Sequence, residues 1–373
     1  MKIIILGGGL QSLSCGSSLY KKNEVSVISS DLMIRKSHFF KKVYVDVKSS
    51  DESLFKLFEK EHFDVLLPVS DTNVPFISKN KEIIESRYGI KCAVPDYEQV
   101  YQVEDKSRFM RFCEEKGVLH PNTMVLGDDS LDDAAESIGF PALIKPDYSI
   151  GARGITRVNS LEELKNKYPE ITEKYGTCTL QEFIDNQEYY YNVMLYRNKE
   201  GEFLGHTIIK IVRKYPIGAG SSSCCISVEN EELLQICKEC LDKLNWVGMA
   251  DFDVLQRLDT KEYKVIEINP RVPASLKAAA ISGVNFPEII VNDTLGQQVS
   301  TCQYEPGKVM RYLGIDILWF VKSSNRFHPI PSWFQFIGRD IYYQDIYKSD
   351  ASTWWTWLVE GLEKLGKRNK QLR

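Results

Sequence analysis

The segment Tyr263–Arg271 constrains the fold and chemistry of this chain most strongly. It is a short apolar run that carries polar side chains at every second position near its end. Because strand side chains alternate between two faces, Glu267, Asn269 and Arg271 are expected on one face. Carboxylate and amide oxygens are ligands that Mg²⁺ prefers, and a guanidinium pairs with two phosphoryl oxygens at once. The strand therefore predicts a metal-and-phosphate site of the kind that ATP chemistry needs.

A second acidic segment precedes this strand. Asp253 lies in Met249–Leu255, which has the apolar–polar alternation of a strand. A turn through Asp259–Lys261 would form a hairpin and bring Asp253 beside Glu267. Two carboxylates together with Asn269 would then hold one or two Mg²⁺ ions that bridge phosphates. A polar edge strand with surface ion pairs is the alternative, but the same-face pattern on two paired strands favours the metal site.

Short apolar runs alternate with helical patterns over residues 1 to about 100, which predicts an open parallel α/β domain. Its first turn carries Gly7, Gly9 and Ser12, and Asp31 follows the second strand. This spacing resembles a dinucleotide-binding turn, although serine replaces the third glycine. A tight turn whose helix N-terminus favours an anionic ligand is the preferred interpretation. An NAD-dependent oxidoreductase is the competing one.

Lys145 ends a buried strand-like run, Pro141–Pro146. A buried lysine needs a partner for its charge, and a phosphate oxygen is one such partner. The turn Ser149–Ile155 follows directly, and its exposed N–H groups could cradle phosphate oxygens with help from Arg153. An ordinary hairpin loop is the alternative. The P-loop pattern G-x-x-x-x-G-K-[ST] does not occur in the sequence, which excludes that class of nucleotide site.

Two further segments could contact a ligand. Leu180–Ile184 is an apolar strand whose end could offer backbone groups to an adenine. Glu188 follows a few residues later, and its carboxylate could bind ribose hydroxyls. Composition alone favours a strand with a polar turn. Arg213–Ser223 is rich in glycine and serine and begins with basic residues, as in mobile loops over anionic substrates. A plain surface loop fits this segment equally well.

Bulk properties exclude several classes of protein. The net charge of −4 disfavours a general nucleic-acid binder, and no apolar run approaches the length of a membrane span. Cys237-x-x-Cys240 lies on a helical pattern without a second pair, so zinc or redox use is disfavoured and a cytoplasmic location with reduced thiols is expected. The tail 354–373 is amphipathic and basic. It could lie on an anionic membrane, but a helix packed on the body is preferred.

From Met1 to about residue 300, the order of these motifs resembles the ATP-grasp superfamily. The resemblance implies that Lys106 and Lys145 bind nucleotide phosphates and that Arg271 is catalytic. It also implies substrate contacts from the first glycine turn, which resembles the start of the pyrrolysine-biosynthetic ligase, and from the basic segment after residue 212. The implied site comprises a flap (Ser149, Gly151, Arg153, Gly154), an adenine hinge (Gln181, Glu182, Phe183, Ile184), a ribose acid (Glu188), metal ligands (Asp253, Glu267, Asn269) and substrate contacts (Gly8, Gly9, Leu10, Arg213).

The resemblance implies a mixed α/β and α+β fold with four parts. A Rossmann-like, open parallel-sheet domain would occupy 1–103, followed by a small lobe with the flap at 104–178 and a large lobe with the metal site at 179–300. An aromatic-rich extension would occupy 301–373. The spacing of Asp253 and Glu267 is similar to that in the carbamoyl-phosphate synthetase branch. Asp253 stands where some relatives carry glutamine, which leaves the number of metal ions open.

The implied activity is that of an ATP-dependent ligase that activates a small carboxylate as an acyl phosphate and joins it to an amine. ATP with Mg²⁺, or Mn²⁺ in its place, would be required. The expected partners are a small-molecule carboxylate and an amine, with no nucleic acid, and a homodimer is compatible with the family. Three alternatives stay open: a bicarbonate-using carboxylase or carbamoyl-phosphate-synthetase-like enzyme, an NAD-dependent oxidoreductase, and an inactive nucleotide-binding module.

Overall fold

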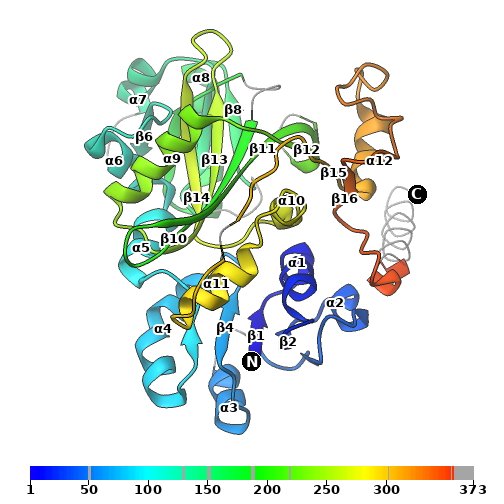
Figure 1. Cartoon of the computed structure of the whole chain (residues 1–373). Helices are drawn as coiled ribbons and strands as arrows, with labels where there is room; N and C mark the ends of the chain where they lie inside the picture. The colour runs from blue at the N-terminus through cyan, green and yellow to red at the C-terminus, as the bar shows by residue number, and fades with distance from the viewer. Residues whose placement is uncertain are drawn as a thin grey trace, which may run out of the picture.

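The computed structural model describes residues 1–48, 52–127, 131–148, 153–185, 190–217, 220–300, 302–353 and 355–356. Within these ranges the chain builds three sheets, of five, seven and four strands. Figure 1 shows the N-terminal domain at the bottom and the two lobes that follow above it. The mixed α/β architecture expected from the sequence is confirmed.

The N-terminal domain is a parallel sheet in the order β3-β2-β1-β4-β5. Its central strand is apolar and fully buried from Ile3 to Leu6, as expected for a parallel strand covered on both faces. The elements are β1 (Lys2–Leu6), α1 (Gly9–Leu19), β2 (Glu24–Ile28), α2 (Leu32–Lys36), β3 (Lys42–Tyr44), α3 (Glu52–Lys60), β4 (Val65–Pro68), α4 (Asn73–Tyr88), β5 (Lys91–Cys92) and α5 (Tyr97–Glu104).

The four-stranded sheet, in the order β6-β9-β7-β8, forms the small lobe. Helices α7 and α8 pack on it through an apolar cluster that includes Ala134, Ile144 and Leu164. Helix α6 begins at an Asp105 N-cap, whose carboxylate accepts a hydrogen bond from the Arg108 N–H. The elements are α6 (Lys106–Lys116), β6 (Thr123–Leu126), α7 (Leu131–Ile138), β7 (Ala142–Pro146), β8 (Thr156–Val158), α8 (Leu161–Tyr175) and β9 (Cys178–Glu182).

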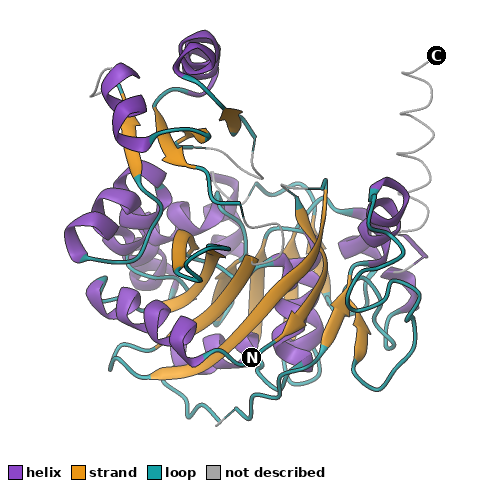
Figure 2. Cartoon of the chain, turned by 90° about the horizontal axis from the view of Figure 1, so that it is seen from above, coloured by secondary structure: helices purple, strands orange, loops and turns teal. Residues whose placement is uncertain are grey.

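The seven-stranded sheet forms the large lobe, in the order β14-β13-β10-β11-β12-β15-β16, and its broad twisted surface is seen in Figure 2. One face packs on α6 and α9, and the other shares a continuous apolar core with the N-terminal domain. The elements are β10 (Tyr190–Arg197), β11 (Phe203–Tyr215), β12 (Ser221–Ser227), α9 (Glu231–Lys243), β13 (Gly248–Gln256), β14 (Tyr263–Asn269), the 3₁₀ helix η1 (Ala274–Leu276), α10 (Lys277–Ile281), α11 (Phe286–Thr294), β15 (Val309–Arg311), α12 (Leu313–Lys322) and β16 (Ile341–Tyr343).

The segment predicted as a loop from Arg213 to Ser223 is mostly strand. β11 continues to Tyr215 and pairs with β12, which begins at Ser221, so only a short connection separates the two strands. The serine-rich composition predicted a loop because serine favours turns. Pairing of β12 with β11 on one side and β15 on the other outweighs that weak local preference.

Two further expectations can be checked on the fold. All nine cysteines are free, and Cys237 and Cys240 are both buried on α9, so their spacing reflects an apolar helix face. In the parts of the chain that the structure describes, no helix combines the length and apolar character that crossing a membrane requires.

Candidate functional site

The predicted acidic hairpin forms, with the expected register. Asp253 lies opposite Glu267 across β13 and β14, and Asp251 lies opposite Asn269. Directly opposed residues of an antiparallel pair share one face, so the four side chains line one side of the sheet. Asn192 on β10 is opposite Asp253 and donates a hydrogen bond to it at 3.0 Å. The hairpin and β10 therefore gather three carboxylates and two amides on one face.

Burial shapes the charge of this cluster. Burial, and then the charge of Glu267, raise the pKa of Asp253 to about 6. Burial and the neighbouring Asp253 raise the pKa of Asp251 well above its usual range. Because each carboxylate disfavours ionisation of its neighbours, a cation placed among them would restore their charged forms.

The donor set fits a hard divalent cation. The buried Oδ1 of Asp251 has no hydrogen-bond partner, and an acceptor without a donor is what a cation or an incoming donor would satisfy. Over the described ranges, no group of three or more His, Cys, Asp or Glu side chains is arranged to hold a metal ion. Mg²⁺ held by Asp253 and Glu267 would thus need the Asn269 oxygen and phosphate oxygens to complete its coordination.

Arg271 follows β14 and reaches the N-terminal domain. Its Nε donates to Asp71 Oδ1 at 2.5 Å, and its Nη2 donates to Asn269 Oδ1 at 3.2 Å. The guanidinium is therefore oriented beside a predicted metal ligand. Asp71 lies between β4 and α4, 200 residues away in sequence, and no motif in the sequence indicated it.

Lys145 brings the small lobe into the site. The lysine lies one residue before the end of β7, is buried, and donates to Gln181 Oε1 at 2.5 Å. Burial lowers the pKa of Lys145 to about 8, the charge of Glu267 opposes this shift, and the positive charge of Lys106 adds to it. Charges that act on a buried lysine in this way lie near it. The structure thus brings Lys106, Lys145 and the acidic hairpin to one region between the lobes.

The predicted adenine hinge has contacts of its own. The Gln181 side chain bonds Lys145 and Thr123, while Glu182 forms an ion pair with Arg257 at 2.8 Å. The Phe183 N–H donates to the Pro141 carbonyl, and Ile184 is buried. Side chains of β6 and β7, and of Arg257 directly after β13, therefore fix the end of β9. Glu188 lies outside the described residues.

The predicted flap is described only at its end. Arg153 and Gly154 lie in a turn before β8, and Ser149 and Gly151 lie outside the described residues. Gly154 has φ of +77°, and a Cβ there would lie 2.8 Å from Tyr175 and 2.9 Å from Pro146. Glycine is therefore required at this position by both conformation and space.

The first glycine turn is satisfied internally. Asp31 Oδ2 accepts a hydrogen bond from the Gly9 N–H at 2.6 Å, and a Cβ on Gly8 would lie 2.5 Å from the same oxygen. Leu10 packs into the core. Because a carboxylate of the chain itself already occupies the N-terminus of α1, this turn does not support the NAD interpretation.

Arg213 has a structural role in place of the expected substrate contact. Its side chain is buried and donates to both carboxylate oxygens of Asp316, at 2.8 and 3.0 Å. Arg311 donates to the same carboxylate at 2.8 Å. Asp316 lies in the first turn of α12, so this Arg–Asp–Arg group attaches α12 to β11 and β15.

We expect Arg213→Ala to destabilise the protein by about 3 kcal/mol, because the buried Asp316 carboxylate would keep only one of its two arginine partners. Urea unfolding would measure the loss. Nucleotide affinity should be unchanged at temperatures where the variant is folded. A stable variant with an altered affinity for substrate would restore the substrate role.

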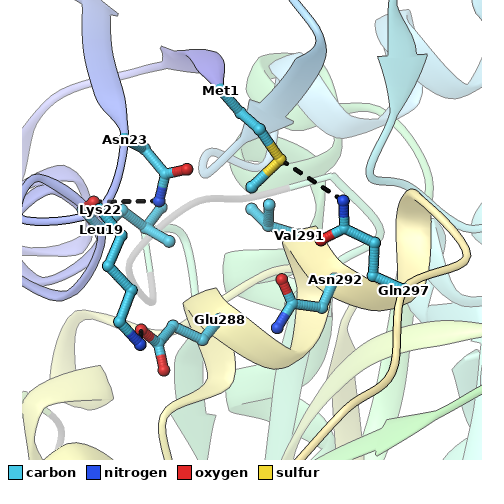
Figure 3. A pocket seen from close by; sticks show the side chains of 8 residues that line it. All are labelled: Met1, Leu19, Lys22, Asn23, Glu288, Val291, Asn292 and Gln297. Carbon is cyan, nitrogen blue, oxygen red and sulfur yellow. Dashed lines mark hydrogen bonds and ion pairs between the residues drawn. The ribbon is translucent and has the colours of Figure 1, made fainter.

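A separate cavity of about 310 Å³ lies away from this cluster, between α1 and α11. Figure 3 shows Lys22 and Glu288 in an ion pair at its wall, with a distance of 2.8 Å between Nζ and Oε1. None of the predicted site residues lines it.

The described residues thus combine a parallel-sheet domain, a buried lysine on the four-stranded sheet and an acidic hairpin on the seven-stranded sheet. Residues 177–315 match the family model described as "ATP-grasp in the biosynthetic pathway with Ter operon". This match identifies an ATP-grasp region within residues 177–315, as the order of the motifs predicted.

Its relatives differ in their named activities. The C-terminal section of the carbamoyl phosphate synthase large chain of Methanopyrus kandleri is 24% identical over 62% of this chain and 44% of that protein. The D-aspartate ligase of Enterococcus faecium is 24% identical over 65% of this chain and 62% of the ligase. The chain thus spans less than two thirds of the length of these curated relatives.

Solved structures share the fold. The biotin carboxylase domain of Hydrogenobacter thermophilus 2-oxoglutarate carboxylase, a dimer in complex with MgADP, ADP and bicarbonate, superposes with a TM-score of 0.67. The match covers 83% of this chain and 73% of that chain at 16% identity. This likeness establishes the architecture and leaves the substrate open.

Proposed function

We propose that this protein is an ATP- and Mg²⁺-dependent ligase that activates a small carboxylate, of the amino-acid class, as an acyl phosphate and joins it to an amine. The observation that carries the proposal is the convergence of the Asp253–Glu267 pair, Asn269 and Arg271 with Lys145 of the other lobe. A D-aspartate ligase among the relatives supports an amino-acid substrate.

The residues of the site would have distinct roles. Lys106 and Lys145 would bind nucleotide phosphates through charge-assisted hydrogen bonds. Asp253, Glu267 and Asn269 would hold Mg²⁺, which when bound neutralises charge on the phosphates. Arg271 would stabilise negative charge that develops on the carboxylate during phosphoryl transfer and on the later tetrahedral species. Asp71, paired with Arg271, holds its guanidinium in place.

A bicarbonate-using enzyme is the second candidate. Relatives named as carbamoyl phosphate synthase, and a neighbour bound to bicarbonate, favour it. It shares the nucleotide and metal residues, so the two candidates differ only in the acceptor. The cytoplasmic location and the homodimer remain predictions.

An ADP-release assay of the purified protein against amino acids, small carboxylates and amines tests the proposal. A carboxylate labelled with ¹⁸O should transfer one label to the released phosphate, because its oxygen attacks the γ-phosphorus. ADP release that needs bicarbonate and no organic acid would favour the second candidate. Formation of AMP and pyrophosphate would exclude both.

The pH dependence of ADP binding tests the role of Lys145. With a pKa of about 8, the free lysine is cationic below that pH and neutral above it, whereas bound phosphates favour its charged form. Affinity for ADP should therefore fall as pH rises above 8, by at most about tenfold per pH unit. Calorimetry with Lys145→Met should give weaker binding by about 1.5–3 kcal/mol at pH 7 and a flatter profile. A wild-type affinity that stays constant to pH 9.5 would contradict this assignment.

A further inference from the structure

The C-terminal extension carries an exposed apolar surface, which we call the aromatic patch. It comprises α12 and the segment that follows it, and its exposed side chains are Ile317, Val321, Phe327, Ile330, Phe334, Phe336 and Ile337. Ile330 is 87% exposed and Ile337 is 92% exposed. Scattered exposed apolar residues are ordinary, but a contiguous group marks an interaction surface.

The patch is held outward by the buried ion-pair group described above. Arg213 donates to the carbonyl of Pro331, and Arg311 donates to the carbonyl of Gln335, at 2.8 and 2.9 Å. The indole of Trp333 donates to the backbone of Asp316 at 3.1 Å and stacks on Phe320, with 4.1 Å between ring centroids. The backbone between the two isoleucines is thus fixed at Pro331 and Gln335, while both isoleucine side chains remain exposed.

The charged side chains within the patch segment are of one sign. The segment 317–339 contains Lys322, Arg326 and Arg339 and neither aspartate nor glutamate, in a chain whose net charge is −4. The next acid, Asp340, is paired with Lys308 at 2.9 Å. Apolar side chains bordered by cations, without anions, are the combination that binds the interface of an anionic bilayer.

We propose that the aromatic patch docks on the surface of an anionic lipid membrane, with the isoleucine and phenylalanine side chains in the acyl boundary and the cations among headgroups. A second copy of the chain fits less well. An isologous dimer places the same patch on both subunits, so the three cations would face their own copies. A lipid surface satisfies both the apolar and the cationic side chains.

Such docking would leave the candidate active site accessible. The patch adjoins β15 and β16 at one edge of the seven-stranded sheet, and the acidic hairpin β13–β14 forms the opposite edge. Figures 1 and 2 show the extension at one side of the molecule, away from the small lobe. Because the patch and the candidate active site lie at opposite edges of the sheet, membrane docking and the proposed reaction can be tested separately.

Vesicle flotation of the full-length protein tests the inference. Vesicles of phosphatidylcholine mixed with phosphatidylglycerol should bind the protein, and vesicles of phosphatidylcholine alone should bind it much less. Ile330→Ser combined with Ile337→Ser should lower the partition coefficient by about tenfold or more, since two exposed side chains lose their apolar burial. Ile83→Ser, at a 54% exposed position on α4, is the matched control and should bind like the wild type.

A second variant tests the contribution of the cationic side chains of the patch. Lys322→Gln with Arg339→Gln should weaken binding to anionic vesicles and reduce its sensitivity to salt. Unchanged flotation of the isoleucine variant, or no preference for anionic vesicles, would overturn the inference. A wild-type dimer in sedimentation that the isoleucine substitutions dissociate, without vesicle binding, would assign the patch to a second copy instead.

Discussion

Glu267→Gln is expected to lower the rate of ADP formation by about three orders of magnitude. Glu267 faces Asp253 across the hairpin and influences the pKa of Lys145, so it lies where the metal and the phosphates would meet. Glutamine keeps the size of the side chain but removes one of two anionic ligands. Loss of several kcal/mol of transition-state charge stabilisation corresponds to about a thousandfold in rate.

A control on the same hairpin separates this effect from folding. Glu262→Gln changes a carboxylate that pairs with Lys264 just before β14 and should keep nearly full activity. Thermal unfolding should show that both variants are folded, and Glu267→Gln should require more Mg²⁺ for any residual turnover. Near-wild-type ADP production by Glu267→Gln would remove the metal site from this hairpin.

The hairpin itself was predictable because local pattern and long-range pairing agree there. Alternation puts Glu267, Asn269 and Arg271 on one face, and a short turn leaves only one register that also buries the apolar positions. The same alternation carries Asp251, two residues before Asp253, which could have been included in the site. Its significance depends on burial, which the sequence does not display.

Other features depend on contacts that no local pattern encodes. Asp71 reaches Arg271 only because the N-terminal domain packs against the large-lobe sheet. Arg213 was expected in a loop, since glycine and serine follow it, but the pairing of β12 with β15 extends the sheet through this region. The role of a basic residue before a polar segment therefore cannot be assigned until its burial is known. Here the buried ion pair with Asp316 indicates a structural role for Arg213.

Arg271→Ala is expected to lower kcat about a thousandfold while changing the affinity for ADP by less than about threefold. The guanidinium contacts Asn269 and Asp71 in the free protein, so its charge is already oriented before any substrate arrives. A preorganised donor acts mainly on charge that develops in the transition state, and its removal typically costs about 10² to 10³ in kcat.

Arg197→Ala provides a matched control for this variant. Both arginines are partly buried, with 14% and 15% of their side chains exposed, and each forms an ion pair, Arg271 with Asp71 and Arg197 with Asp242. Arg197 lies at the end of β10, outside the cluster, so its loss should affect stability and leave kcat nearly intact. Steady-state kinetics and calorimetry on the two variants would separate the effects. If Arg271→Ala instead weakened ADP binding as strongly as it slowed turnover, the guanidinium would act on the ground state, and its assignment to the developing acyl phosphate would be wrong.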